Sequence, residues 1–266
     1  MNDLASLTTN TFNIDINVYK SMTCLSMKES FNSPITKDML PSSLLALDLG
    51  GSFNQPIIPG VTLPDSITKL SFGPVDKYPS WSSTNMTMFN QPLLVGSLPS
   101  SLIDLSLSYL FNQEVLPGVL PKSLIKLRFG GVFSRVLTAD SLPSDLRELV
   151  VSRSYSHPIP PLPSLRSLTI SSDNQLDTTS LPLIDTLILF EAGPPLPLPQ
   201  SLTHLVMPYF GASLNYPPLP ESLTKWELPQ TDGTFPSVIP PSLTRPCPSR
   251  GQDILALARY PNLSPS

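Results

Sequence analysis

Histidine and cysteine are the side chains of this chain best suited to metal binding or acid–base chemistry, so their spacing is considered first. The chain of 266 residues has two histidines, His157 and His204, and two cysteines, Cys24 and Cys247. Metal sites and catalytic sites need several such groups that converge on one point. These four residues are scattered along the chain without metal-ligand spacing. We therefore predict no metal site and no cofactor.

Serine is the other potential nucleophile, but the serine positions indicate a structural role. Seven serines share one position, two residues after a proline: Ser43, Ser66, Ser101, Ser123, Ser201, Ser222 and Ser242. A hydroxyl in such a place can bond a backbone group of a turn. The chain also has no G-x-S-x-G, G-x-G-x-x-G or P-loop sequence. We therefore predict no catalytic residues and no enzymatic activity.

The proline–serine spacing belongs to an internal repeat. Leu-Pro recurs along the chain and is followed by an L-x-x-L-x-L pattern, as in Leu44, Leu47 and Leu49. A second element, Phe-Asn-Gln-Pro in its best-preserved form, begins at Phe31, Phe53, Phe89, Phe111 and Phe133, with Tyr155 in the next copy. Most of these starting positions are 22 residues apart, and the gap from Phe53 to Phe89 is 36. A repeat of this length is typical of solenoid proteins.

One repeat predicts one short strand. In the L-x-L segment the two leucines lie on the same side of a strand, because side chains alternate between its faces. Such a strand cannot fold alone, so identical rungs must stack and share a core. The 33 prolines exclude a helical solenoid. We predict an all-β fold, a parallel β-solenoid of about ten rungs of 22 residues. Its buried column is Leu47, Leu70, Leu105, Leu127, Leu149, Leu168, Leu187, Leu205 and Trp226.

The predicted solenoid covers residues 19–241, with an N-terminal cap at 1–18 and a C-terminal cap and tail at 242–266. Residues 12–18 alternate apolar and polar side chains, which predicts a strand in the first cap. Residues 252–260 follow a capping-box pattern and predict a short helix that closes the other end; the alternative is a helix offered to a partner. Residues 246–248, Pro-Cys-Pro, replace the expected last strand. An insertion lies at about 76–88.

These repeats resemble the FNIP repeat, a relative of leucine-rich repeats. The resemblance covers most of residues 19–241 and is most specific around Phe31, Phe53, Phe89 and Phe111. It implies a horseshoe-like or straight β-solenoid that is used for protein interaction. It supplies no catalytic residues.

Composition limits the partners and the location. Charged residues make up 14% of the chain and the net charge is −4, so no strong electrostatic attraction to nucleic acid or to an anionic membrane is expected. No apolar run has the length of a membrane span. The start of the chain lacks the features of a signal peptide, and the two cysteines lie near opposite ends and are predicted to be reduced thiols. We expect a cytoplasmic protein with a protein partner.

The residues between the inward leucines point outward, and they supply the candidate binding surface. This column is polar at first and then apolar at Val150, Thr169, Ile188 and Val206, with Lys126, Arg128 and His204 beside it. An outward apolar stripe with a polar rim is typical of an interaction site. The alternative is that β-branched residues simply suit exposed strands.

A second candidate is the insertion, where Trp81 lies outside the rung pattern. An exposed aromatic residue there would be a plausible anchor for a partner, and the alternative is a loop folded back over the core edge. The leading functional prediction is a protein-interaction module or scaffold. The alternatives are the recognition subunit of a larger regulatory assembly and, less in keeping with the residues, a solenoid enzyme.

Overall fold

A computed structural model describes residues 5–7, 21–73, 86–152, 154–171, 181–190, 198–207, 218–228, 242–243 and 246–248. These residues form a solenoid with one short strand in each rung. The strands are β1 (Ala5–Leu7), β2 (Cys24–Met27), β3 (Ala46–Asp48), β4 (Lys69–Ser71), β5 (Asp104–Ser106), β6 (Lys126–Arg128), β7 (Glu148–Val150), β8 (Ser167–Ser171), β9 (Thr186–Phe190), β10 (His204–Val206), β11 (Lys225–Leu228) and β12 (Pro246–Pro248).

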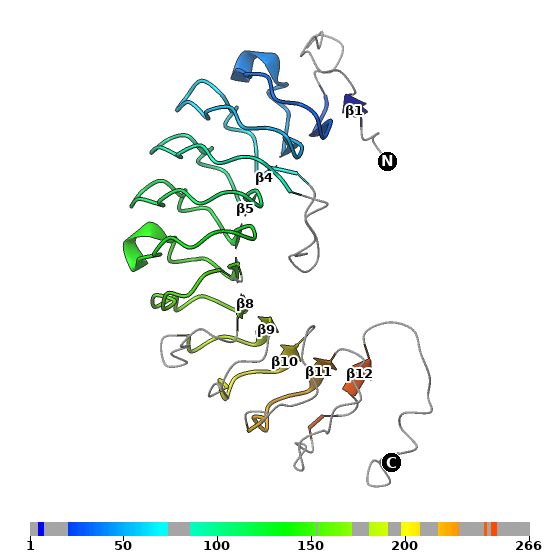
Figure 1. Ribbon diagram of the computed structural model, residues 1–266, viewed down its shortest axis with the longest axis vertical. Coiled ribbons are helices and arrows are strands. Elements are labelled where there is room, and N and C mark those ends of the chain that lie inside the picture. Colours follow the sequence, from blue (N-terminus) through cyan, green and yellow to red (C-terminus); the bar gives the residue numbers. More distant parts are fainter. Residues whose placement is uncertain are drawn as a thin grey trace.

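The strands make one parallel sheet of 12 strands in strict sequence order. Figure 1 shows the sheet along the inner side of an arc, with the return turns on the outer side. Two short 3-10 helices, η1 (Lys37–Met39) and η3 (Ala139–Ser141), lie in these outer turns. The predicted all-β solenoid is confirmed, and the ten strands β2–β11 fall within residues 19–241.

The sheet register matches the predicted repeat register. Leu47 pairs with Leu70, Leu70 with Leu105, and Leu105 with Leu127, and the column continues without a shift to Trp226. Every residue of the predicted column is buried, with no more than 1% of its surface exposed. A slip of one residue would turn all of these side chains to solvent, so the leucine spacing specifies the register.

An aromatic stack forms the second part of the core. Phe31, Phe53, Phe89, Phe111, Phe133 and Tyr155 are buried, and successive ring centroids lie 6.0–6.3 Å apart. Neighbouring strands of a sheet are only about 4.8 Å apart. Successive rungs are therefore further apart at the aromatic stack than at the sheet. This difference in spacing bends the solenoid toward the sheet side. This difference accounts for the arc in Figure 1.

Asparagine side chains connect neighbouring rungs beside the aromatic stack. The Oδ1 atom of Asn90 accepts the backbone N–H of Asn112 at 3.0 Å, and Asn54 does the same for the N–H of Asn90 at 2.9 Å. The next side chain adds a second link, because Nε2 of Gln113 donates to the carbonyl oxygen of Asn90 at 3.0 Å. Each of these asparagines therefore bonds the backbone of the following rung.

The seven serines after the prolines also link rungs. Each hydroxyl donates to a carbonyl oxygen of the preceding rung at 2.6–2.9 Å, as Ser66 does to Leu44 and Ser123 does to Leu102. These hydroxyls satisfy backbone acceptors that the short strands leave open. Their role is structural, as the repeat position indicated.

The described sheet continues on both sides of the ten strands β2–β11, with β1 before them and β12 after them. Pro246–Pro248 forms β12, parallel to β11, so the expectation that this Pro-Cys-Pro segment replaces a strand was wrong. Proline is tolerated on an edge strand, because a backbone nitrogen that faces away from the neighbouring strand makes no bond in the ladder. Residues two apart in a strand face the same way, so Pro246 and Pro248 can both be accommodated. The predicted strand at 12–18 and the predicted helix at 252–260 lie outside the described residues. The cap assignments stay predictions.

Glycine follows several strands and turns for two different reasons. Gly50 and Gly60 both have a left-handed backbone, with φ of 74° and 66°. A Cβ at Gly50 would overlap the carbonyl oxygen of Lys28 in the preceding rung, whereas a Cβ at Gly60 would meet nothing within 4 Å. Gly60 is therefore needed for its backbone conformation alone, and Gly50 also for the close approach of two rungs.

The two glycines allow a matched test of this distinction. Gly60→Ala should destabilise the fold by about 1 kcal/mol, the usual penalty for a left-handed residue with a side chain. Gly50→Ala should cost clearly more, because a backbone carbonyl cannot move aside as a flexible side chain can. Thermal melts of both variants measure the difference. Equal losses would show that the rungs separate at Gly50 without penalty.

Candidate protein-interaction surface

The inner face of the sheet presents two columns of side chains that point away from the core. The first column begins each strand and includes Lys69, Asp104, Lys126 and Glu148. The second column lies two residues further on and runs through Arg128, Val150, Thr169, Ile188 and Val206. We call these two columns the concave face. Its residues neighbour one another through the strand register rather than through sequence proximity.

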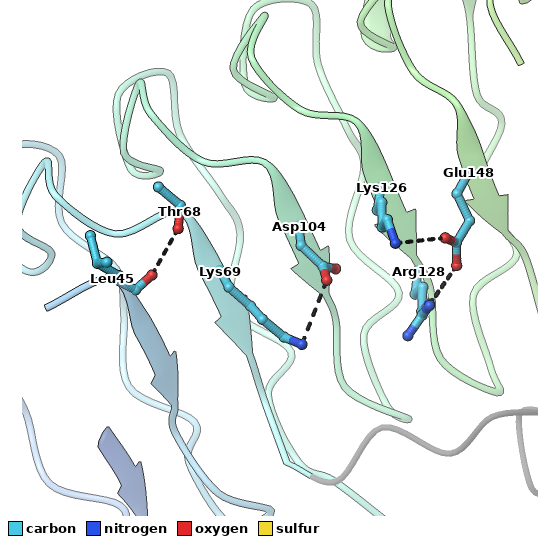
Figure 2. Close-up of polar contacts among 7 residues, drawn as sticks. All are labelled: Leu45, Thr68, Lys69, Asp104, Lys126, Arg128 and Glu148. Carbon is cyan, nitrogen blue, oxygen red and sulfur yellow. Dashed lines mark hydrogen bonds and ion pairs between the residues drawn. The ribbon is translucent and has the colours of Figure 1, made fainter. Parts of the chain in front are cut away.

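Ion pairs cross the first half of the concave face (Figure 2). The Nζ atom of Lys69 lies 3.7 Å from Oδ2 of Asp104 on the next strand. Glu148 receives two cations, with Nζ of Lys126 at 3.4 Å from Oε2 and Nη2 of Arg128 at 2.5 Å from Oε1. At the edge of this region the hydroxyl of Thr68 donates to the carbonyl oxygen of Leu45 at 3.2 Å. The first half of the face thus carries two separate groups of charged side chains that are paired across neighbouring strands.

These cations decide the charge of Glu148. Burial disfavours its ionised form, but the hydrogen bond from Arg128 and the charges of Arg128 and Lys126 outweigh burial and hold the pKa of Glu148 below its usual value. The carboxylate is therefore ionised at neutral pH and binds two rungs to each other. Partly exposed pairs of this kind contribute little to stability, and their arrangement mainly sets the charge pattern of the face.

A second ionic group lies on β10 and β11. Nε2 of His204 lies 3.2 Å from Oε1 of Glu227, and Nζ of Lys225 lies 2.5 Å from the same oxygen. Burial acts against ionisation of Glu227, but Lys225 and then His204 outweigh it and lower its pKa. His204 was predicted as a neighbour of the apolar stripe, and the structure places it on the concave face beside a carboxylate.

The predicted apolar stripe is continuous but recessed. Strand register places Val150 beside Thr169, Thr169 beside Ile188, and Ile188 beside Val206. Val150 and Val206 are buried although neither belongs to the hydrophobic core, so they lie on the other face of the sheet. Thr169 is also buried, and Ile188 is half-buried. Ile188 is thus the most accessible member of the stripe.

The structure places the other histidine away from this face. His157 follows Tyr155 of the aromatic stack, and its Nε2 is 3.0 Å from the carbonyl oxygen of Ser134 in the preceding rung, so its role is that of the glutamines in earlier rungs. Trp81 lies outside the described residues. Within the described ranges no group of three histidine, cysteine, aspartate or glutamate side chains could hold a metal ion, and no helix there is long and apolar enough to cross a membrane.

A second exposed surface was missed by the sequence analysis. Side chains in the outer turns of three successive rungs are apolar and about half exposed, namely Ile58, Leu94 and Leu116, at 52%, 55% and 50%. Val95 is exposed in the same turn as Leu94, and Val136 is exposed in the next rung, three places after Phe133. We call these five residues the outer ridge. The signal was present in the sequence, because Ile58, Leu94 and Leu116 each directly follow the buried residue four places after the repeat phenylalanine.

The curved parallel sheet, the buried leucine column and the asparagine links define a leucine-rich-repeat-like solenoid. The FNIP Repeat family matches residues 31–74 and 89–131, so these two segments are FNIP repeats. These two segments hold the rungs with the best-preserved Phe-Asn-Gln-Pro elements. Leucine-rich-repeat solenoids typically mediate protein interactions through extended concave surfaces.

One solved structure with a TM-score above 0.5 has the same fold. CroV588, described as a novel circular leucine-rich-repeat protein, matches with 30% sequence identity and a TM-score of 0.62, over 85% of this chain and 33% of CroV588. The chain therefore spans about a third of the length of CroV588. YopM from Yersinia enterocolitica WA-314 matches with 20% identity and a TM-score of 0.42, over 92% of this chain and 62% of YopM. No curated protein matches the sequence.

Proposed function

We propose that this chain is a protein-interaction module that binds a partner protein on its concave face and acts as a scaffold without catalysis. One observation carries the proposal: the described sheet runs through twelve strands, and its inner face combines paired charges with a short apolar stripe. The serine and asparagine side chains that might have served chemistry are instead bonded to neighbouring rungs.

Two further parts of the proposal follow from the same features. A role as the recognition subunit of a larger regulatory assembly would use the same face, with the effector in another protein. A cytoplasmic location suits the exposed free thiol of Cys24, because such a thiol persists in a reducing compartment. We propose a protein partner and neither a nucleic acid nor a membrane.

The test compares the concave face with the outer ridge. Ile188→Asp places a charge in the accessible part of the apolar stripe. It is preferred to a change at Val150, where a buried carboxylate would lose its hydration and destabilise the fold. Leu94→Asp places the same charge on the outer ridge, where the side chain is half exposed. Each variant and the unmodified chain are used to capture partners, which are identified by mass spectrometry.

We expect Ile188→Asp to lose the captured partner while its thermal melt stays close to that of the unmodified chain. Leu94→Asp should keep the partner. If only the Leu94→Asp variant loses the partner while it remains folded, the binding site lies on the outer ridge instead.

A further inference from the structure

The ion pairs on the concave face share an asymmetry that the sequence does not reveal. In each pair the basic side chain is the more exposed member. Lys69 is 58% exposed against 19% for Asp104, Lys126 is 46% exposed and Arg128 30% against 22% for Glu148, and Lys225 is 50% and His204 26% exposed against 14% for Glu227. The described part of this face therefore presents cations to solvent above a layer of carboxylates.

This pattern is local. The whole chain has a net charge of −4, so the exposed cations do not result from an excess of basic residues. The recessed carboxylates remain ionised, because the lysines and Arg128 outweigh burial and lower the pKa values of Glu148 and Glu227. They hold the basic side chains in place, which lowers the entropy lost when a ligand binds them. An ammonium has three N–H donors, so Lys126 can contact Glu148 and an incoming carboxylate together.

The cations lie on both sides of the apolar stripe. Lys126 and Arg128 are on β6, Ile188 is on β9, and Lys225 is on β11. Five strand-to-strand steps separate β6 from β11, a distance of about 24 Å at the usual strand spacing. An extended chain covers that distance in about seven residues.

We propose that the concave face binds an extended acidic segment of a partner protein, about seven residues between its acidic ends, with small apolar side chains in the middle. The acidic ends contact Lys126 and Arg128 on one side and Lys225 on the other, and the middle lies on Ile188. This inference rests on the proposed function, and it adds the chemistry of the partner. A nucleic acid carries phosphates along its whole length, and these would lie against the apolar centre and the carboxylates beneath the lysines. These features of the face therefore favour an acidic peptide.

The test uses a defined peptide. A fluorescent peptide of about ten residues carries glutamates at both ends and alanine and valine between them, and a second peptide has lysine in place of each glutamate. Binding to the full chain is measured by fluorescence anisotropy at low salt and at about 0.5 M salt, where electrostatic attraction is screened within about 4 Å. A single-stranded oligonucleotide of similar length is the third probe.

Two double variants with the same change in net charge separate the face from the overall charge. Lys126→Gln with Lys225→Gln removes two cations from the face and leaves Arg128 beside Glu148 and His204 beside Glu227. The matched control removes two exposed cations elsewhere, by Lys37→Gln in η1 and Arg135→Gln. Glutamine suits position 135, because Gln113 holds the equivalent place one rung earlier and makes the equivalent bond to a carbonyl oxygen.

We expect the glutamate peptide to bind at least about tenfold more tightly than the lysine peptide, and to weaken by about tenfold in the concave-face variant but not in the control. Binding should also weaken at high salt. Equal binding of both peptides, tighter binding of the oligonucleotide, or equal losses in the two double variants would overturn the acidic-segment proposal. If that occurs while Ile188→Asp still abolishes partner capture, the concave face remains the binding site and only the partner chemistry is wrong.

Discussion

Leu127→Ala should destabilise the solenoid by about 2–5 kcal/mol, the range for a buried leucine replaced by alanine. Leu127 is fully buried in the middle of the stack and pairs in register with Leu105 and Leu149 on the adjacent strands. A cavity there weakens the contacts of one rung with both neighbours, and a solenoid has no other contacts to compensate. Chemical denaturation followed by circular dichroism measures the loss.

Leu116→Ala is the matched control for this measurement. It removes the same atoms from the same region of the chain, but Leu116 is half exposed on the outer ridge. The expected cost is within about 0.5 kcal/mol, as for most surface substitutions. If Leu127→Ala were no more harmful than Leu116→Ala, the buried leucine column would be assigned to the wrong position.

The contrast between these two leucines shows what the sequence can predict. Leu127 belongs to an L-x-L pair, and alternation within a strand requires that one face of such pairs is inside. Repetition of that pattern is enough to fix the sheet, its parallel order and its register. Leu116 is also a leucine, but it lies in a turn. No regular alternation of side chains there relates the position of a residue in the sequence to its burial. Its exposure follows from the path of the outer turn, which the repeat spacing alone does not describe.

The apolar stripe shows a different limit. Alternation correctly places Val150 and Val206 outside the core, but both are buried. The face on which a side chain lies follows from its position in the strand. Its exposure also depends on how closely the neighbouring side chains approach on a curved sheet, and the curvature arises from the difference between strand spacing and aromatic stacking.

Pro246–Pro248 illustrates a limit of propensity arguments. Two prolines in three residues argue against a strand, because each lacks the N–H that the ladder uses. The segment nevertheless forms β12, with Cys247 paired in register with Glu227. The register of the stack, continued by Ser242 two residues after Pro240, outweighs the local preference. The hydroxyl of Ser242 donates to the carbonyl oxygen of Leu223 at 2.8 Å, as in earlier rungs.

Phe111→Ala should produce the other large loss of stability, about 3–5 kcal/mol, the usual range for a buried phenylalanine. The ring of Phe111 is fully buried and stacks on Phe89 at 6.0 Å and on Phe133 at 6.3 Å between centroids. The substitution therefore removes one aromatic layer from the stack and breaks its contacts with the layers on both sides. Because each rung contacts only its neighbours, the damage should divide the solenoid into two weakly coupled halves. A broader or biphasic unfolding transition is the expected signature.

Phe111→Tyr is the matched control, because it keeps the aromatic layer that Phe111→Ala removes. The chain itself places tyrosine at this repeat position in Tyr155, which stacks on Phe133 at 6.0 Å and donates its hydroxyl to the carbonyl oxygen of Pro158 at 3.2 Å. The equivalent acceptor for a tyrosine at 111 is the carbonyl oxygen of Glu114. With that bond formed, the stack is kept and the buried hydroxyl is satisfied, so the cost should be about 1 kcal/mol or less. A loss as large as that of Phe111→Ala would mean that the turn after Phe111 cannot accept the hydroxyl. A sharp single transition in Phe111→Ala would instead show that the leucine column alone couples the two halves.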